Sequence, residues 1–497
     1  MKKSIHLLAI LLAMPLLAVH AAESESDNGG VQERQVTTEH SVRINGDSID
    51  YTATTGTLVL RDSDGGPKAS FFYIAYTRDD IRNRNQRPVT FTFNGGPGSS
   101  SVWLHLGTFG PKRVVFDDAE QPEPAPYRLS DNEESLLDVT DLVFIDPVGT
   151  GFSRAEGDTD AKEFYGVEED RKAVADFIRL WTARNNRWNS PKFLAGESYG
   201  TTRAAAVVTE LQQRGMFMNG VILVSSILNF QTARFETGND LPYVMFLPTY
   251  AATAWYHGKV EGYDDNLEGF LAEARAFAAS EYTLALMQGD TLADSRRQAV
   301  AEKLAKFTGL DEEFLLQANL RPSIFRFVKE LLRDERRTVG RLDSRYTGID
   351  SDAAGEGFEH DPSYTAITGP YTAAMNSYLR NELGYEEDRE YEILSFTVNR
   401  NWNWDTGRAG YVNVAEDLRR AMSTNTHLEV FVANGYYDLA TPFYATEYTM
   451  DHLGLEPELR DNIEMAYYPA GHMMYIHPPS LEKLNDDIRS YITSTLQ

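Results

Sequence analysis

Residues 192–200 read KFLAGESYG, and this stretch decides the fold. Residues 193–195 are apolar and typical of a buried strand, and a helical pattern begins at Thr201 and is closed by Gly215. A Gly-x-Ser-x-Gly sequence between a strand and a helix predicts a tight turn that exposes the serine hydroxyl above a sheet. The N-terminus of the following helix favours negative charge near that hydroxyl. We therefore predict that Ser198 is a nucleophile; the alternative is a helix N-cap without chemistry.

The segments around this turn alternate between short apolar runs and helical patterns, which is typical of a mostly parallel sheet covered by helices. Antiparallel strands are expected between residues 40 and 76. Later strands are expected at 89–93, 142–146, 193–196, 221–225, 428–433 and 464–468, with helices at 167–188, 201–214 and 480–496. The order predicts an α/β fold.

Residues 230–385 interrupt this alternation. Helical patterns at 267–287, 291–307 and 312–336 follow one another there, and no strand alternation persists. The pattern predicts a mainly helical insertion, or lid, that divides the α/β core into two parts at 40–229 and 386–497. Residues 22–39 are polar and are expected to form a leader.

A serine hydroxyl is a poor nucleophile without a general base, and the base needs a carboxylate to orient it. In sheets of this kind the partners follow the serine in the order Asp, then His. Asp438 comes directly after the predicted strand 428–433, and His472 comes directly after the predicted strand 464–468. We therefore predict a triad of Ser198, Asp438 and His472. The rival candidates, which fit the order or the placement less well, are His477, Asp405, Asp451 and His452.

A second motif, NGGPGSS at residues 94–100, ends the predicted strand 89–93. Glycines in such a loop let backbone N–H groups approach a ligand, and a loop after an early strand supplies one donor of an oxyanion hole. The other donor is expected to be the N–H of Tyr199. The alternative is a glycine-rich turn without a ligand. A phosphate-binding loop is excluded because the Lys and the Ser or Thr that close it are absent.

The net charge and the absence of cysteine exclude several kinds of partner and site. The 497 residues carry a formal net charge of −27 at pH 7, which argues against a nucleic acid partner because such affinity comes largely from clustered Lys and Arg. The chain has no cysteine, which excludes disulfides, thiolate metal sites and a cysteine nucleophile.

The first residues are typical of a targeting signal. Lys2 and Lys3 precede an apolar core at residues 7–19, and the small residues near Ala21 suit a cleavage site. We predict a signal peptide at 1–21 and an exported protein, periplasmic or secreted, with no stable membrane insertion after the signal is removed. The alternative is an uncleaved membrane anchor. Lysine-based targeting without disulfides favours a bacterial origin.

Together the motifs resemble the serine carboxypeptidase family. The resemblance is carried, in the family's order, by FNGGPGSS at 93–100, DPVGTGFS at 146–153, GESY at 196–199 and AGHM at 470–473. It implies an α/β-hydrolase fold with a helical insertion, and it implies Ser198, Asp438 and His472 as the triad. The amides of Gly96 and Tyr199 would form the oxyanion hole. Asn94 and Glu197 would hydrogen-bond the C-terminal carboxylate of the substrate, and neither a metal nor an organic cofactor would be needed.

Two departures from the family bear on specificity. Thr108 stands where members have a second carboxylate-binding Glu, and Tyr475 stands where Pro is usual. Two carboxyl groups in contact cannot both stay ionised cheaply, so one must hold a proton; the family's preference for acidic pH follows from this. With one carboxylic acid fewer, we expect carboxylate recognition to be weaker or less dependent on acid.

The sequence therefore predicts an exported serine-type carboxypeptidase whose partners are peptides with a free C-terminus. An esterase or acyltransferase that uses the same triad stays open, because fold and triad do not separate these reactions. A binding protein without turnover is the remaining alternative. Neither the preferred side chains nor the oligomeric state can be read from the sequence.

Overall fold

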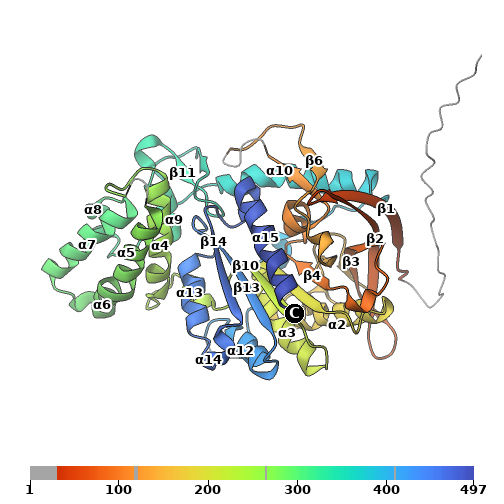
Figure 1. Ribbon diagram of the computed structural model, residues 1–497. Helices are drawn as coiled ribbons and strands as arrows, with labels where there is room; N and C mark the ends of the chain where they lie inside the picture. Colours follow the sequence, from red (N-terminus) through yellow and green to blue (C-terminus); the bar gives the residue numbers. More distant parts are fainter. Residues whose placement is uncertain (1–30, 117–120, 264–265, 408–409) are drawn as a thin grey trace, which may run out of the picture.

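The computed structural model describes residues 31–116, 121–263, 266–407 and 410–497 (Figure 1). The signal predicted at 1–21 and residues 22–30 of the predicted leader lie outside the described residues. The remainder of that stretch is not all leader, because strand β1 begins at Gln35.

A single twisted sheet forms the centre of the molecule. Its strands are β1 (Gln35–Ile44), β2 (Asp47–Arg61), β3 (Pro67–Arg78), β4 (Val89–Phe93), β7 (Asp141–Ile145), β8 (Arg154–Ala155), β9 (Lys192–Ser198), β10 (Gly220–Ser226), β13 (Glu429–Gly435) and β14 (Ile463–Tyr468). They lie in the order β1-β2-β3-β7-β4-β9-β10-β13-β14, with β8 beside β3. The first four strands of this order pair antiparallel and the rest pair parallel. The prediction of an α/β fold is confirmed, and each strand predicted after residue 80 lies within two residues of its expected bounds.

Helices cover both faces of this sheet. One face packs on α2 (Val167–Arg184), α3 (Tyr199–Gln213) and α12 (Ala415–Thr424), and the other packs on α1 (Val102–Leu104), the π-turn His105–Phe109, α10 (Pro362–Asn381) and α15 (Pro478–Ser494). In α2, for example, the buried Trp181 meets Phe91 of β4 edge to face, with ring centroids 5.4 Å apart. Such burial of apolar area is the main force that holds the layers together.

A group of helices stands beyond the β14 side of the sheet and has an apolar core of its own (Figure 1, green). It contains α4 (Leu241–Tyr256), α5 (Leu267–Phe277), α6 (Thr283–Gln288), α7 (Asp294–Thr308), α8 (Glu312–Gln317) and α9 (Ile324–Glu330). The helix expected at 312–336 is broken, because Asn319 and Leu320 both have positive φ and Pro322 follows.

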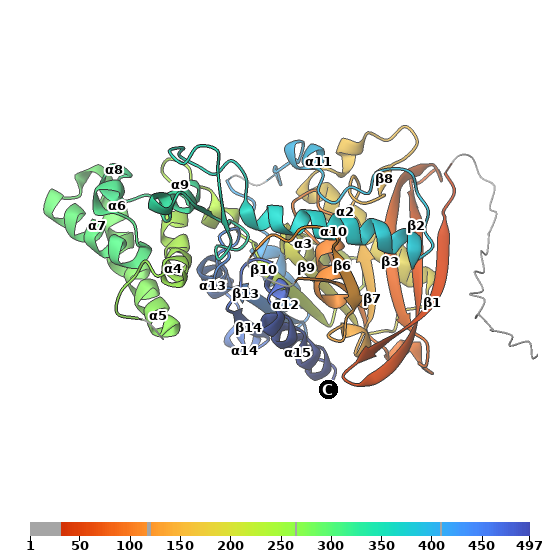
Figure 2. The same cartoon turned by 90° about the horizontal axis from the view of Figure 1, so that it is seen from above.

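Two features of residues 230–385 differ from a purely helical lid. The short strands β11 (Thr338–Val339) and β12 (Thr347–Gly348) form a hairpin there. Helix α10 runs away from the helical group and across the core sheet towards β1 and β2 (Figures 1 and 2). The last part of this stretch therefore belongs to the packing of the sheet.

Two further strands and three further α-helices are present in the described residues. They are β5 (Lys112–Val115), β6 (Arg128–Asp131), α11 (Phe396–Arg400), α13 (Phe443–Asp451) and α14 (Pro457–Arg460). None of the helices in the described parts of the chain combines the length and the apolar character needed to cross a membrane.

Candidate active site

Ser198 lies on a strained turn between β9 and α3. Its backbone has φ 61° and ψ −129°, a conformation that residues with a side chain rarely adopt. The turn closes only because its flanking residues lack side chains: a Cβ on Gly196 would lie 2.1 Å from the carbonyl oxygen of Gly200. Strain held at one serine by two glycines is the geometry that the Gly-x-Ser-x-Gly motif predicts.

A histidine and an aspartate lie next to this turn, after β14 and β13. Nδ1 of His472 is 2.8 Å from Oδ2 of Asp438, and both side chains are buried. Asp438 Oδ1 accepts the N–H groups of Ala440 (2.8 Å) and Thr441 (3.0 Å), and Oδ2 accepts the Thr441 hydroxyl (2.7 Å). Because a carboxylate only accepts hydrogen bonds, Nδ1 carries the proton, and Nε2 is left as the basic nitrogen.

The protonation of His472 is set by two opposing influences. Burial favours the neutral imidazole, but the carboxylate of Asp438 favours the charged form, and the net result raises the pKa of His472 above its ordinary value. An imidazolium that forms during proton transfer is therefore stabilised in place.

The loops that carry Asp438 and His472 are tied to the segment 341–344 between β11 and β12. The bonds run from Leu439 N–H to Arg341 O (3.1 Å), from His472 N–H to Leu342 O (2.7 Å), from Gly471 N–H to Asp343 Oδ2 (3.1 Å) and from Ser344 N–H to Tyr437 O (3.0 Å). Part of the support for His472 and Asp438 thus comes from residues outside the sheet.

Ser198 and His472 both line a cavity of about 650 Å³. No hydrogen bond joins the serine hydroxyl to the imidazole in the described structure, and contacts of this kind are often loose without substrate. The volume suits a small peptide. Its aromatic lining consists of Trp103, Phe325, Phe358, Tyr364 and Phe396.

The glycine-rich loop after β4 packs directly on the serine turn. A Cβ on Gly95 would lie 2.4 Å from the amide nitrogen of Tyr199, so only glycine allows this approach. Gly96, with φ 101°, lines the same cavity as Ser198. The loop and the start of α3 therefore lie side by side next to Ser198, as two amides of an oxyanion hole would need to. The roles of Ser198, Gly96 and Tyr199 stay predictions.

The buried ion pair between Arg203 and Asp170 supports the glycine-rich loop. Arg203 of α3 donates to the carbonyl oxygen of Asn94 (2.5 Å) and to Oδ2 of Asp170 (2.6 Å). Oδ1 of Asn94 accepts the N–H of Leu104 (3.1 Å). The sequence analysis missed Arg203; the available signal was a cation in an otherwise apolar run, Ala204–Val208 following it, of a helix expected to be buried.

Glu197 directly precedes Ser198, is 3% exposed and lines the cavity. The hydroxyl of Tyr475 donates to its Oε2 (2.6 Å), and the side chain of Asn94 also hydrogen-bonds it. Burial raises the pKa of Glu197 to about 7, although the charge of His472 and the hydrogen bonds from Tyr475 and Asn94 oppose this rise. The carboxyl can therefore hold a proton near neutrality and donate it to an anion.

Thr108 does not take the place of a second acid. Its hydroxyl donates to Oδ1 of Asn485 (2.8 Å) in a buried contact. The partner of Glu197 is Tyr475, whose ring fills the space beside Gly107, where a Cβ would lie 2.3 Å from ring carbon Cε2. The sequence analysis treated Tyr475 only as a departure from the family, because its contact with Glu197 spans 278 residues of sequence.

The DPVGTGFS segment has a structural role. Asp146 Oδ1 accepts the N–H (2.8 Å) and the hydroxyl (2.9 Å) of Ser101, and Oδ2 accepts the hydroxyl of Tyr391 (2.8 Å). Complete burial raises the pKa of Asp146 to about 6. Gly151 is required because a Cβ there would lie 1.8 Å from Asp146 Oδ2. The segment fixes the chain just after the glycine-rich loop.

The rival candidates lie elsewhere. His477 contacts the hydroxyl of Ser480 at the start of α15, and Asp405 accepts the N–H of Gly407 in an exposed turn. Asp451 and His452 are exposed. None of these four residues lines the cavity of Ser198.

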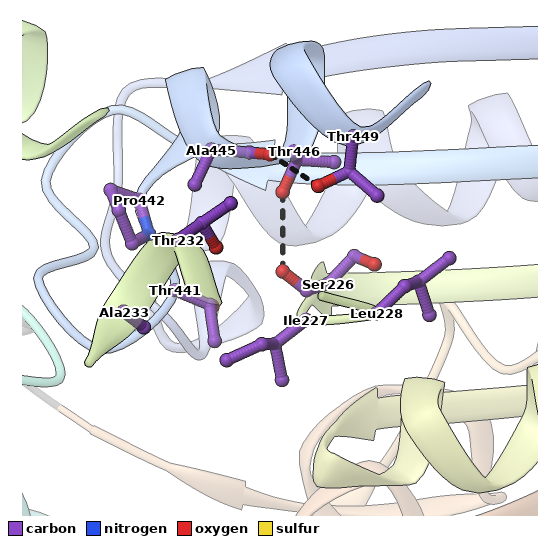
Figure 3. A pocket seen from close by; sticks show the side chains of 10 residues that line it. All are labelled: Ser226, Ile227, Leu228, Thr232, Ala233, Thr441, Pro442, Ala445, Thr446 and Thr449. Carbon is purple, nitrogen blue, oxygen red and sulfur yellow. Dashed lines mark hydrogen bonds between the residues drawn. The ribbon is translucent and has the colours of Figure 1, made fainter. Parts of the chain in front are cut away.

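A second, much smaller cavity lies behind Thr441 (Figure 3). It measures about 10 Å³, and its walls include Ser226, whose carbonyl oxygen accepts the hydroxyl of Thr446 (3.2 Å). A space of this size holds about one water molecule. This space is therefore too small to hold a peptide. Among the residues described, no group of three or more His, Asp or Glu side chains is placed to hold a metal ion.

These features define the class of protein. A parallel sheet in which one strand leads through a strained serine into a helix, with an aspartate and a histidine after two later strands, is the α/β-hydrolase fold. Residues 51–268 of the chain match the family model of serine carboxypeptidases. That region contains the glycine-rich loop and Ser198 and ends before Asp438 and His472.

Named relatives match about a third of the chain. The pheromone-processing carboxypeptidase KEX1 of Yarrowia lipolytica is 30% identical over 182 residues, which are 36% of this chain and 27% of that protein. The retinoid-inducible serine carboxypeptidase of Homo sapiens is 28% identical over 150 residues, 29% of this chain and 30% of that protein. The chain thus spans less than a third of the length of these relatives.

A solved structure of a carboxypeptidase aligns with most of this chain. The prohormone-processing carboxypeptidase KEX1(delta)p of Saccharomyces cerevisiae aligns with a TM-score of 0.58 and 16% identity, covering 89% of this chain and 91% of that one. At this identity the likeness shows the shared fold.

Proposed function

We propose that the protein is a serine-type carboxypeptidase that releases C-terminal residues from peptides. The observation that carries this proposal is the pair Asn94 and Glu197, which line the same cavity as Ser198, with Glu197 able to hold a proton near pH 7. An amide and a carboxylic acid beside the nucleophile suit the free carboxylate of a peptide end. The family match of residues 51–268 and the names of the relatives support the same reaction.

In the proposed mechanism the Ser198 hydroxyl attacks the carbonyl carbon of the last peptide bond while Nε2 of His472 takes its proton. Asp438 holds the imidazole and stabilises its charge. The amides of Gly96 and Tyr199 stabilise the oxyanion. His472 then returns the proton to the leaving amino group, and water, activated by the same imidazole, hydrolyses the acyl-enzyme.

An N-blocked dipeptide and its C-terminal amide test the proposal, assayed between about pH 4 and 8, where a carboxyl of raised pKa titrates. We expect kcat/KM to be higher for the free acid than for the amide by about tenfold or more, because a hydrogen bond to a charged group contributes a free energy of this size. Ser198→Ala is the control and should abolish hydrolysis. Equal rates on acid and amide, or activity on simple esters alone, would instead favour the esterase or acyltransferase reading.

Covalent labelling distinguishes a binding protein without turnover from all of these enzymes. A fluorophosphonate should modify Ser198 in the wild type and leave Ser198→Ala unlabelled. The ordered hydrogen bonds between His472 and Asp438 favour labelling, because a binding site has no need of them.

We further propose that residues 1–21 direct export to the periplasm or the exterior and that the chain is bacterial; the basic and apolar pattern of those residues and the cysteine-free composition support this. Residues 230–385 are proposed as the insertion that builds the outer wall of the substrate site. Phe325, Phe358 and Tyr364, which lie in that stretch and line the cavity, support this assignment.

A further inference from the structure

The cavity of Ser198 contains three acidic residues and one arginine along its walls: Glu197, Glu359, Asp361 and Arg341. The acids all have hydrogen-bond partners within the protein. Arg341 differs from them, because its guanidinium makes no hydrogen bond or ion pair with any residue that the structure describes.

The carboxylate of Asp361 accepts hydrogen bonds from the backbone around it. Its Oδ1 accepts the N–H groups of Arg341 (3.0 Å) and Ser363 (3.0 Å), and its Oδ2 accepts the N–H of Leu342 (3.2 Å). The carboxylate therefore fixes the main chain of Arg341 and leaves the guanidinium free to face the cavity.

The carboxylate of Glu359 also accepts hydrogen bonds from nearby residues. Its two oxygens accept the hydroxyl (2.5 Å) and the N–H (3.0 Å) of Ser351 and the N–H of Asp352 (3.2 Å). This carboxylate holds the neighbouring loop and makes no ion pair with Arg341 in the described structure.

Arg341 lies close to the reacting groups. Its carbonyl oxygen accepts the N–H of Leu439, and the next residue, Leu342, accepts the N–H of His472. Burial and Asp438 have the largest effects on the pKa of His472, and the positive charge of Arg341 also acts on it, in the lowering direction. The side chain is half-buried, so it is only partly screened by solvent.

A guanidinium held in this way is a ready site for a carboxylate, which it can bind through two parallel N–H···O bonds. We propose that Arg341 binds a side-chain carboxylate of the substrate, so that the protein prefers peptides with Asp or Glu at one of the two residues that flank the scissile bond. The proposal rests on the proposed peptidase function and adds the class of side chain that this site selects.

The experiment compares N-blocked dipeptides in which Glu is exchanged for the isosteric, neutral Gln, first at the terminal and then at the penultimate position, at about pH 6.5, where a free Glu side chain is ionised. We expect kcat/KM to favour Glu by about tenfold at one position. Arg341→Gln should bring kcat/KM for the Glu and Gln peptides to within about twofold of each other; a change in rate that follows from the effect of this charge on His472 is common to both peptides and cancels in their ratio. Arg341→Glu should favour a Lys peptide over its Gln counterpart. Arg337→Gln, which makes the same charge change outside the cavity, is the matched control.

Two results would overturn the proposal. One is the absence of a Glu preference at both positions in the wild type. The other is an equal loss on all peptides in Arg341→Gln, which would mean that Arg341 binds the terminal carboxylate or supports the fold. Affinities of the same peptides for Ser198→Ala, measured by calorimetry, keep this test independent of turnover: a Glu preference in binding without hydrolysis by the wild type would retain Arg341 as the acidic subsite and reject the peptidase function.

Discussion

Replacing Tyr475 by Phe removes the hydroxyl that donates to Oε2 of Glu197 and keeps the ring that fills the space beside Gly107. The hydrogen bond from Tyr475 stabilises the charged form of the Glu197 carboxyl, so its removal favours the protonated form. A hydrogen bond to a charged group contributes about 2 kcal/mol. Since one pKa unit corresponds to roughly 1.4 kcal/mol, the pKa of Glu197 should rise from about 7 to between about 8 and 9.

The assay is the ratio of kcat/KM for an N-blocked dipeptide to that for its amide, followed from about pH 5 to 10, a range that brackets both pKa values of Glu197. Both substrates use the same triad, so the titration of His472 cancels in the ratio. If protonated Glu197 binds the terminal carboxylate, the ratio in the wild type falls as pH rises through about 7. In Tyr475→Phe the fall should occur about one to two pH units higher.

Tyr371→Phe is the control, because that buried tyrosine lies beside Gly107 and has no hydrogen bond to Glu197 in the described structure. The reasoning is refuted if the midpoint of the ratio stays in place in Tyr475→Phe, or if both variants move it equally. Far-ultraviolet circular dichroism and thermal melting establish that each variant is folded.

Three further substitutions test neighbouring parts of the site. Glu197→Gln should flatten the same ratio across pH, because the amide cannot titrate; a wild-type profile would remove Glu197 from carboxylate binding. Arg203→Met should lower the free energy of unfolding in urea by about 3–5 kcal/mol, since it leaves the Asp170 carboxylate buried without its partner, and a loss below about 1 kcal/mol would contradict this. Gly95→Ala should abolish fluorophosphonate labelling of Ser198 in a protein that stays folded, because the new methyl group would lie 2.4 Å from the amide nitrogen of Tyr199; wild-type labelling would show that the loop can move.

Much of the core could be predicted because its signals are local. The strand β9, the serine turn and the helix α3 are contiguous, and their apolar pattern and glycines decide the conformation together. The proximity of Asp438 and His472 was predictable for a related reason: each follows a parallel strand, and the carboxyl ends of such strands share one edge of the sheet.

What escaped prediction depends on contacts between distant residues. Tyr475 reaches Glu197, and Arg203 reaches the carbonyl of Asn94, through packing that no local pattern encodes. The break after α8 was missed because the apolar periodicity of 312–336 continues across Asn319 and Leu320, whose positive φ values interrupt it. Helix α10 contains an internal Pro370 and a weak apolar stripe, so its place on the sheet had little sequence signal.

The bonds between segment 341–344 and the loops of Asp438 and His472 change how the insertion should be treated in protein engineering. A lid can be treated as a self-contained module and exchanged between related proteins to make a chimera. Here a graft that removed residues 230–385 would also remove the acceptor for the backbone N–H of His472 and the helix α10 that shields one face of the sheet. A chimera should therefore change the helical group α4–α9 and retain the chain from β11 to α10.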